Sequence, residues 1–206
     1  MMRKLALILS AVLHPLFMPL LGVFIAYQFD WYLNGIISAD QMQIIYLIVA
    51  FSTIVFPGVN ILLLKWYGVV TSLSMRNRTE RNAPYVSTIF FFVLGYYMLR
   101  KGALPDSLFS ILIGCIATLF FITIINFRWK ISAHAAGIFG IIGALIALFR
   151  IHSFGNITLL CVLLLAGGLV ITSRLILNAH TPSESYVGAI LGFTTVYTCV
   201  YFGVVI

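Results

Sequence analysis

The chain has few charged residues, and acidic ones are the scarcest. Of 206 residues, 12 are Lys or Arg and 5 are Asp or Glu, whereas 62% are hydrophobic. A soluble domain has about 25% charged residues, so the 8% found here is too little to cover its surface. This composition excludes a soluble enzyme and a disordered tail. The net charge of +7 does not indicate nucleic-acid binding, because no basic face remains outside the apolar runs.

Cysteine is also sparse, and its placement argues against a covalent or metal framework. The three cysteines, Cys115, Cys161 and Cys199, all lie inside apolar runs, where cysteine behaves as a small hydrophobic residue. The chain shows no internal repeat, low-complexity tract or soluble domain. We therefore expect no disulfide and no structural zinc site.

Long apolar runs dominate what is present. A membrane-spanning helix needs about 17–25 mostly apolar residues, and runs of that length are apolar all round, unlike the alternating strands of a barrel. Seven runs qualify: Leu5–Phe29, Gln41–Leu64, Asn82–Leu99, Ser107–Phe127, Ile131–Phe149, Ile151–Ser173 and Ser185–Ile206. The sequence predicts an all-α polytopic transmembrane bundle of six or seven spans, forming a single domain over residues 1–206.

Prolines modify two of these runs. Pro15 and Pro19 should kink the first run, which is too long for a signal peptide and lacks an obvious cleavage site. A turn at Ala83 and Pro84 is expected to shorten the third run.

The charges divide unequally between the two sides that seven spans define. The side that holds the N-terminus is called side A. Its basic residues are Arg3, Lys4, Lys65, Arg76, Arg78, Arg81, Arg128, Lys130 and Arg174. The opposite side has only Arg100, Lys101 and Arg150. The positive-inside rule would place side A in the cytoplasm, but basic residues gathered for anion binding would produce the same asymmetry.

Three polar clusters fall in the side A connections, at residues 74–84, 128–134 and 173–184. If they converge, they bring guanidinium groups, two histidines and carboxylates together at the membrane surface. Guanidinium groups match phosphate oxygens. Histidine can act as a nucleophile or a general acid near neutral pH, and an adjacent carboxylate orients its ring.

The third cluster has the most specific spacing. Ser173 and Arg174 are followed after five residues by His180 and after three more by Glu184. This resembles the third motif of the type 2 phosphatidic acid phosphatase superfamily, which includes the vanadium haloperoxidases. The family motif ends in Asp, where this chain has Glu184.

The other two clusters resemble the remaining family motifs in the same order. Residues 131–134 read Ile-Ser-Ala-His where the family has Pro-Ser-Gly-His. In the first motif, Arg76 and Pro84 stand at the family's Lys and Pro positions, and Ala83 occupies the family's Arg position. Arg81, two residues earlier, could supply the missing guanidinium group.

The resemblance implies a metal-independent phosphohydrolase without a cofactor. His180 would attack phosphorus, Glu184 would hold its ring, and His134 would protonate the leaving oxygen and then activate water. The implied phosphate-binding residues are Arg76, Arg81, Lys130, Ser132, Ala133, Ser173 and Arg174. The substrate would be a lipid phosphate or diphosphate taken from the bilayer, and the protein would lie in a bacterial inner membrane.

Two questions of chemistry stay open at this stage. A nucleophilic His180 must be neutral, but Glu184 would raise its pKa while guanidinium groups would lower it. A two-metal site is not favoured, because side A offers only Glu80 and Glu184 as carboxylate ligands.

Plainer structural readings exist for the same residues. Thr181 to Glu184 fits a capping box, and Ser132 fits an N-cap. His14 is expected to be packed or bonded to backbone, and His152 to be a loop residue remote from the site. The arginines around Glu80 fit a loop that faces lipid headgroups.

The apolar spans allow structural and functional readings as well. The aromatic residues at 90–92 and 96–97 should face lipid or its interface, or line an acyl or prenyl groove. The glycines at 137, 140, 143, 188 and 192 should permit close helix packing. Two alternative functions are a lipid phosphotransferase and a non-catalytic lipid-binding or transport protein on the same scaffold.

Overall fold

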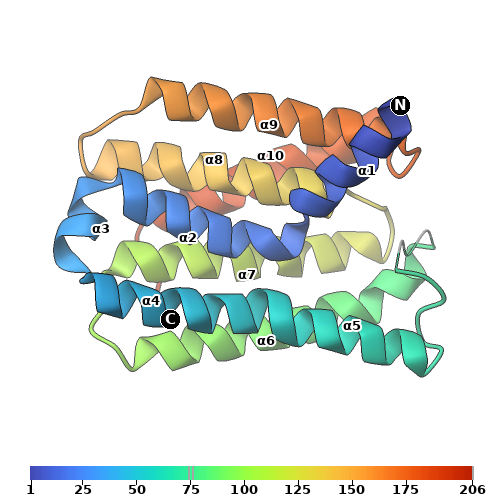
Figure 1. The fold of residues 1–206 in the computed structure, drawn as a ribbon, viewed down its shortest axis with the longest axis horizontal. Helices are drawn as coiled ribbons and strands as arrows, with labels where there is room; N and C mark the ends of the chain where they lie inside the picture. Colours follow the sequence, from blue (N-terminus) through green and yellow to red (C-terminus); the bar gives the residue numbers. More distant parts are fainter. Residues whose placement is uncertain (74, 76, 206) are drawn as a thin grey trace.

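The computed structural model describes residues 1–73, 75 and 77–205, and all regular elements within these ranges are helical. Ser74, Arg76 and Ile206 lie outside the described residues, so the predicted phosphate contact of Arg76 is not among the contacts below. The long helices lie side by side and run between the two ends of the molecule (Figure 1). This is the all-α bundle that the composition predicts.

Within the described residues, six helical segments are long and apolar enough to cross a membrane. Three of them are single helices: α7 (Asp106–Asn126), α8 (Ala133–Ile151) and α9 (Ile157–Ile176). The other three are built from shorter pieces: α1 (Met2–Val12), η1 (Pro15–Phe17) and α2 (Met18–Phe29); α4 (Ala39–Ala50), η2 (Phe51–Val55) and α5 (Phe56–Trp66); and η3 (Thr79–Arg81) and α6 (Asn82–Arg100). The chain is therefore a multi-pass integral membrane protein.

Two further helices complete the bundle. The short helix α3 (Trp31–Ile36) joins the first two spans. The 20-residue helix α10 (Pro182–Tyr201) is not among the six segments, but it is long enough to run alongside α8. The last predicted run therefore forms a seventh long helix.

The predicted kink in the first span is confirmed as a break at Pro15. Helix α1 ends at Val12, and the 3-10 turn η1 begins at Pro15, which has no N–H to donate to the preceding turn. Pro19 lies in the first turn of α2, where its missing N–H would have no partner within the helix. The chain therefore changes direction between α1 and α2 (Figure 1).

The turn expected at Ala83 and Pro84 is wrong. Helix α6 begins at Asn82, directly after η3, and includes both residues. Proline is tolerated in a first helical turn because the N–H groups there have no partner within the helix. The third span is therefore longer than the sequence pattern suggested.

All three predicted side A connections lie at one end of the bundle. The links from α5 to α6, from α7 to α8 and from α9 to α10 gather at the end where the N-terminus lies (Figure 1). The three polar clusters are thereby brought to a common end, because two long helices, an even number of crossings, separate each connection from the next.

Glycine brings α8 and α10 into close contact, which confirms that prediction. A Cβ atom at Gly192 would lie 2.0 Å from the carbonyl oxygen of Ala136, and one at Gly188 would lie 2.6 Å from that of Ser132. The backbone N–H of Ser132 also donates to the carbonyl of Glu184 (3.0 Å). The starts of the two helices are thus held together, and both carry predicted site residues.

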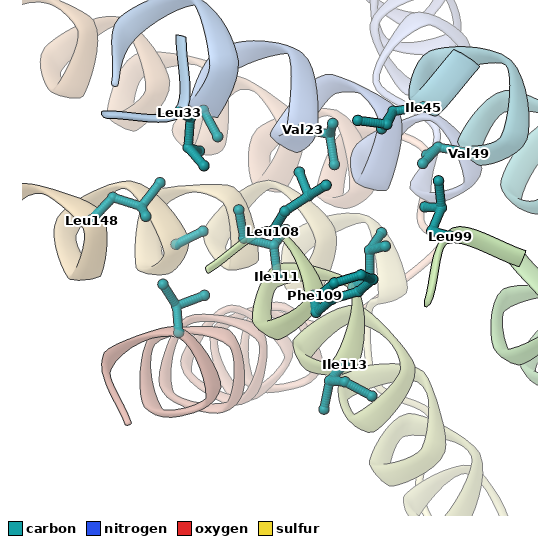
Figure 2. Packing of buried hydrophobic residues seen from close by; sticks show 14 of the residues in the cluster. Val23, Leu33, Ile45, Val49, Leu99, Leu108, Phe109, Ile111, Ile113 and Leu148 are labelled. Atoms are coloured by element: carbon teal, nitrogen blue, oxygen red, sulfur yellow. The ribbon is translucent and has the colours of Figure 1, made fainter. Parts of the chain in front are cut away.

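The main apolar core lies where α2, α4, α6, α7 and α8 meet. Val23, Leu108, Phe109 and Leu148 are all at most 1% exposed and belong to this core (Figure 2). Other large apolar side chains on the outer helices are exposed, as lipid contact requires.

A buried contact between His152 and Asp30 closes the end of the bundle opposite side A. His152 caps the C-terminus of α8, and its Nδ1 lies 2.5 Å from a carboxylate oxygen of Asp30, which is fully buried. The ring of Tyr32 lies 4.4 Å from that of His152. His152 is remote from the side A cluster, as expected, but it anchors α3 and is more than a loop residue.

Candidate active site at one end of the bundle

The side A end of the bundle contains a cavity of about 940 Å³. Its polar lining includes Arg81, Lys130, His134, Arg174 and His180. Its other walls include Met18, Phe92, Ile111, Ile141, Ala144 and Val196, which lie on the long helices α2, α6, α7, α8 and α10. The cavity therefore has a cationic, histidine-bearing part and an apolar part that extends into the bundle.

His180 is held by the start of α10. Its side chain lies in the connection just before the helix and the residue is 7% exposed. Its Nδ1 lies 3.0 Å from Oε2 of Glu184, and the same oxygen accepts a hydrogen bond from the backbone N–H of Thr181 (3.1 Å). The predicted capping box is confirmed, and Glu184 contacts the His180 ring with the same oxygen that caps the helix. Because a carboxylate oxygen can only accept, Nδ1 carries the proton in this contact.

The surroundings keep the His180 imidazole neutral. Burial is the main cause that lowers its pKa, to about 3, and the charges of Arg81, Arg174 and Lys130 lower it further. A hydrogen bond with the backbone of Lys130 acts in the opposite direction. Burial and the neighbouring cationic groups therefore both favour the neutral ring, the form that a nucleophile requires.

Arg81 also contributes its guanidinium group to this cavity. The residue is 7% exposed, lines the cavity, and its Nε donates to the carbonyl of Met75 (3.0 Å). The turn η3 positions it just before α6. The structure thus brings this guanidinium group to His180, as the sequence predicts.

Lys130 and Arg174 add two more cationic groups to the same wall. Burial, with the charges of Arg81 and Arg174, lowers the pKa of Lys130, while Glu184 acts in the opposite direction. Nη1 of Arg174 donates to the hydroxyl of Ser10 (3.3 Å), but its buried Nε has no hydrogen-bond partner among the described residues. A buried donor without a partner is costly in a protein, so this wall is suited to an anion.

His134 enters the cavity from the second position of α8. Its Nε2 lies 3.1 Å from the backbone carbonyl of Ser10, which can only accept, so Nε2 carries the proton. Its ring also meets that of His14 edge to face, with centroids 5.2 Å apart. The structure therefore brings both predicted catalytic histidines to one cavity.

Sequence reasoning missed the contribution of the first span. His14 is bonded to backbone as predicted, since its Nδ1 accepts from the N–H of Leu16 (3.3 Å), but it also lines the cavity. Ser10 contacts both His134 and Arg174. The useful signal was Pro15, because a helix break next to a histidine inside a span leaves polar groups that need partners.

Two predicted phosphate-binding hydroxyls are not brought to the cavity. The Ser132 hydroxyl accepts from the N–H of Ala135 (3.4 Å), which confirms its N-cap role. The Ser173 hydroxyl donates to the carbonyl of Leu169 (2.7 Å) in its own helix. Neither serine is among the lining residues, whereas Ala133 is.

The fold and this cavity together define a multi-pass helical membrane protein with a buried cluster of histidine and arginine at one end. In the part of the chain that the structure describes, no three His, Cys, Asp or Glu side chains are grouped so that they could hold a metal ion. Comparison with protein-family models, with curated proteins and with solved structures finds no match to this chain.

Proposed function

We propose that this protein removes phosphate from a membrane lipid phosphate or diphosphate through a phosphohistidine formed on His180, without a metal ion. The observation that carries the proposal is the pairing of His180 with Glu184 (3.0 Å) inside a cavity that is cationic at one end and apolar beyond it. This is the arrangement to which the resemblance to type 2 phosphatidic acid phosphatases also points.

The cationic part of the cavity fits a phosphate group. Arg81, Lys130 and Arg174 provide positive charge from three different connections or helix ends. Phosphoryl transfer depends mainly on positioning and on stabilising charge that spreads over the equatorial oxygens. The unpartnered Nε of Arg174 is a donor that such an oxygen would satisfy.

The apolar part fits the rest of a lipid. Ligand pockets of about 300–1,000 Å³ bury most of the surface of a small ligand, and this cavity is about 940 Å³. Its walls come from α2, α6, α7, α8 and α10, inside the span region. A hydrocarbon chain could therefore enter the bundle while its phosphate stays among the arginines.

The chemistry takes two balanced steps. In the first, the lone pair on Nε2 of His180 forms a P–N bond, the P–O bond to the leaving group breaks, and the leaving oxygen takes a proton from His134. Glu184 stabilises the positive charge that develops on the His180 ring. In the second, His134 takes a proton from water, the resulting hydroxide attacks phosphorus, and the P–N bond breaks to release phosphate.

The test is phosphate release from a panel of lipid phosphates by the purified protein, with EDTA present. We expect His180→Ala to abolish release, and brief incubation of the wild-type protein with labelled substrate to trap an acid-labile, base-stable phosphoryl group. Unchanged release by a folded His180→Ala variant, or complete loss with EDTA that Mg²⁺ restores, would contradict the proposal. Assay of phosphorylated alcohols among the products separates hydrolysis from transfer.

A further inference from the structure

The break in the first span leaves a backbone carbonyl without a partner in its own helix. The last four carbonyls of an α-helix have no intrahelical donor unless the chain continues. The last such bond in α1 runs from the N–H of Leu13 to the carbonyl of Leu9 (2.9 Å). The N–H that would bond to the Ser10 carbonyl in a continued helix belongs to His14, which has extended backbone (φ −71°, ψ 141°) because Pro15 follows it. The carbonyl of Ser10 is therefore released to accept a bond from elsewhere.

His134 uses this carbonyl. Its Nε2 donates to the carbonyl of Ser10 (3.1 Å), in a place where Ser10 is only 7% exposed. The His14 ring packs against the same imidazole, and the charged or titratable groups that face it are His14, Arg174 and His180. With Nε2 engaged, Nδ1 is the ring nitrogen left to exchange a proton with a bound substrate.

We propose that the Ser10 carbonyl is a positioning group for His134, as Glu184 is for His180, so that the helix break at Pro15 is part of the catalytic apparatus. This inference rests on the proposed function. When Nδ1 carries a proton, the ring is cationic and the carbonyl oxygen stabilises it through Nε2–H. When Nδ1 has given that proton to the leaving oxygen, the same bond keeps the ring in the tautomer that can later accept a proton from water.

A single ester bond tests the proposal directly. Replacing the Ser10–Ala11 amide by an ester weakens the Ser10 carbonyl as an acceptor and leaves every side chain in place. The matched control is an ester at the Ala11–Val12 bond. It also removes one helical N–H, but it weakens a carbonyl that does not contact His134.

The readout compares two leaving groups. An alkyl phosphate needs its leaving oxygen protonated, whereas para-nitrophenyl phosphate releases a stable anion and depends little on a general acid. We expect the Ser10–Ala11 ester to lower kcat/KM for an alkyl phosphate about tenfold more than for para-nitrophenyl phosphate. The control ester should change this ratio by less than about threefold. Equal effects of both esters, or an unchanged ratio in the first, would overturn the inference.

A second measurement separates this inference from the proposed function. If the wild-type protein cleaves neither these two phosphates nor the lipid phosphates of the panel, the proposed function fails, and the site is then judged by ¹⁵N NMR of the His134 ring. We expect the neutral ring to carry its proton on Nε2, with a signal that shifts in the Ser10–Ala11 ester but not in the control. A proton on Nδ1, or equal shifts in both esters, would overturn the positioning role.

Discussion

At the scale of single residues, Glu184 combines a structural and a chemical role on one carboxylate oxygen. Oε2 accepts from the N–H of Thr181 as part of the capping box and from the His180 ring. Glutamine can serve in a capping box as well as glutamate does, but it carries no charge. The two roles can therefore be separated by substitution.

We expect Glu184→Gln to lower kcat by about 100- to 10,000-fold with little change in thermal stability. Glu184→Ala should lose the same activity and also about 1 kcal/mol of stability, because the cap is removed as well. Phosphate release and thermal unfolding in detergent measure the two effects. Full activity in a folded Glu184→Gln variant would show that Glu184 acts only as a helix cap.

The lowered pKa of His180 also predicts how stability depends on pH. The folded ring titrates at about 3 and an unfolded histidine at 6.5, so the unfolded chain binds more protons between these values. The stability that the neutral His180 ring contributes is therefore fully present above pH 6.5, and it declines as the pH falls towards 3.

We expect the titration of His180 to lower the free energy of unfolding by about 2 kcal/mol when the pH falls from 7.5 to 5. His180→Gln, which cannot titrate, should lose correspondingly less stability over the same interval. Unfolding of both proteins in one detergent at the two pH values measures the difference. The other histidines are present in both proteins, so equal losses would show that His180 is not held neutral by the fold.

The residues of the candidate site could be predicted only where sequence spacing follows local geometry. His180 and Glu184 are a helical turn apart, so their pairing follows from the start of α10. Arg81 could be named because it lies two residues before Ala83, the position at which the resembled motif has its arginine. His14 was read as an ordinary packed residue, because its contact with His134 spans 120 positions of the chain and depends on how α1 bends across the bundle.

At the scale of elements, the glycine seam between α8 and α10 sets the relative positions of the two helix starts that carry His134 and His180. A Cβ atom at Gly192 would lie 2.0 Å from a backbone oxygen of Ala136, and backbone cannot move aside as a flexible side chain can. Such a contact forces the helices apart. His134 and His180 would separate with them.

We expect Gly192→Ala to cost about 1–3 kcal/mol of stability and most of the activity. Gly168→Ala is the matched control, because Gly168 is exposed on α9 and nothing lies within 4 Å of an added Cβ atom there. It should retain both stability and activity. Equal behaviour of the two variants in thermal unfolding and phosphate release would mean that the seam does not determine the site.

Run length was sufficient to predict the long helices, but not where they are interrupted. A lipid-exposed backbone must bond to itself, so an uncharged run of sufficient length implies a helix. Whether a proline breaks a helix depends on its position: Pro15 falls after α1 ends, whereas Pro84 falls in the first turn of α6. The π-helical turn η2 leaves no comparable mark in the residue pattern.

At the scale of the whole molecule, the cavity could not have been predicted, because it is the space that seven packed helices leave between them. Its lining comes from residues as distant in sequence as Leu7 and Val196. The sequence gives Ile111 no mark that distinguishes it from other span residues, and for Phe92 a groove is only one of two interpretations. Only the packing shows that both side chains face an interior space connected to the arginines. The proposed function depends on this connection, because a lipid must place its phosphate and its chain at the same time.

Blocking the apolar part of the cavity should therefore affect long chains selectively. Cys115 lines the cavity on α7, 11 residues before the helix ends at Asn126, or about 16 Å along the axis. We expect Cys115→Phe to lower kcat/KM about tenfold or more for long-chain lipid phosphates, because displacing two methylenes costs about 1.6 kcal/mol of burial. Phosphates with chains too short to reach Cys115 should be cleaved as before. Cys161→Phe is the matched control, because it introduces the same ring at an exposed position on α9, and it should change neither rate. An equal loss for short-chain and long-chain phosphates in Cys115→Phe would show that the lipid chain does not occupy this cavity.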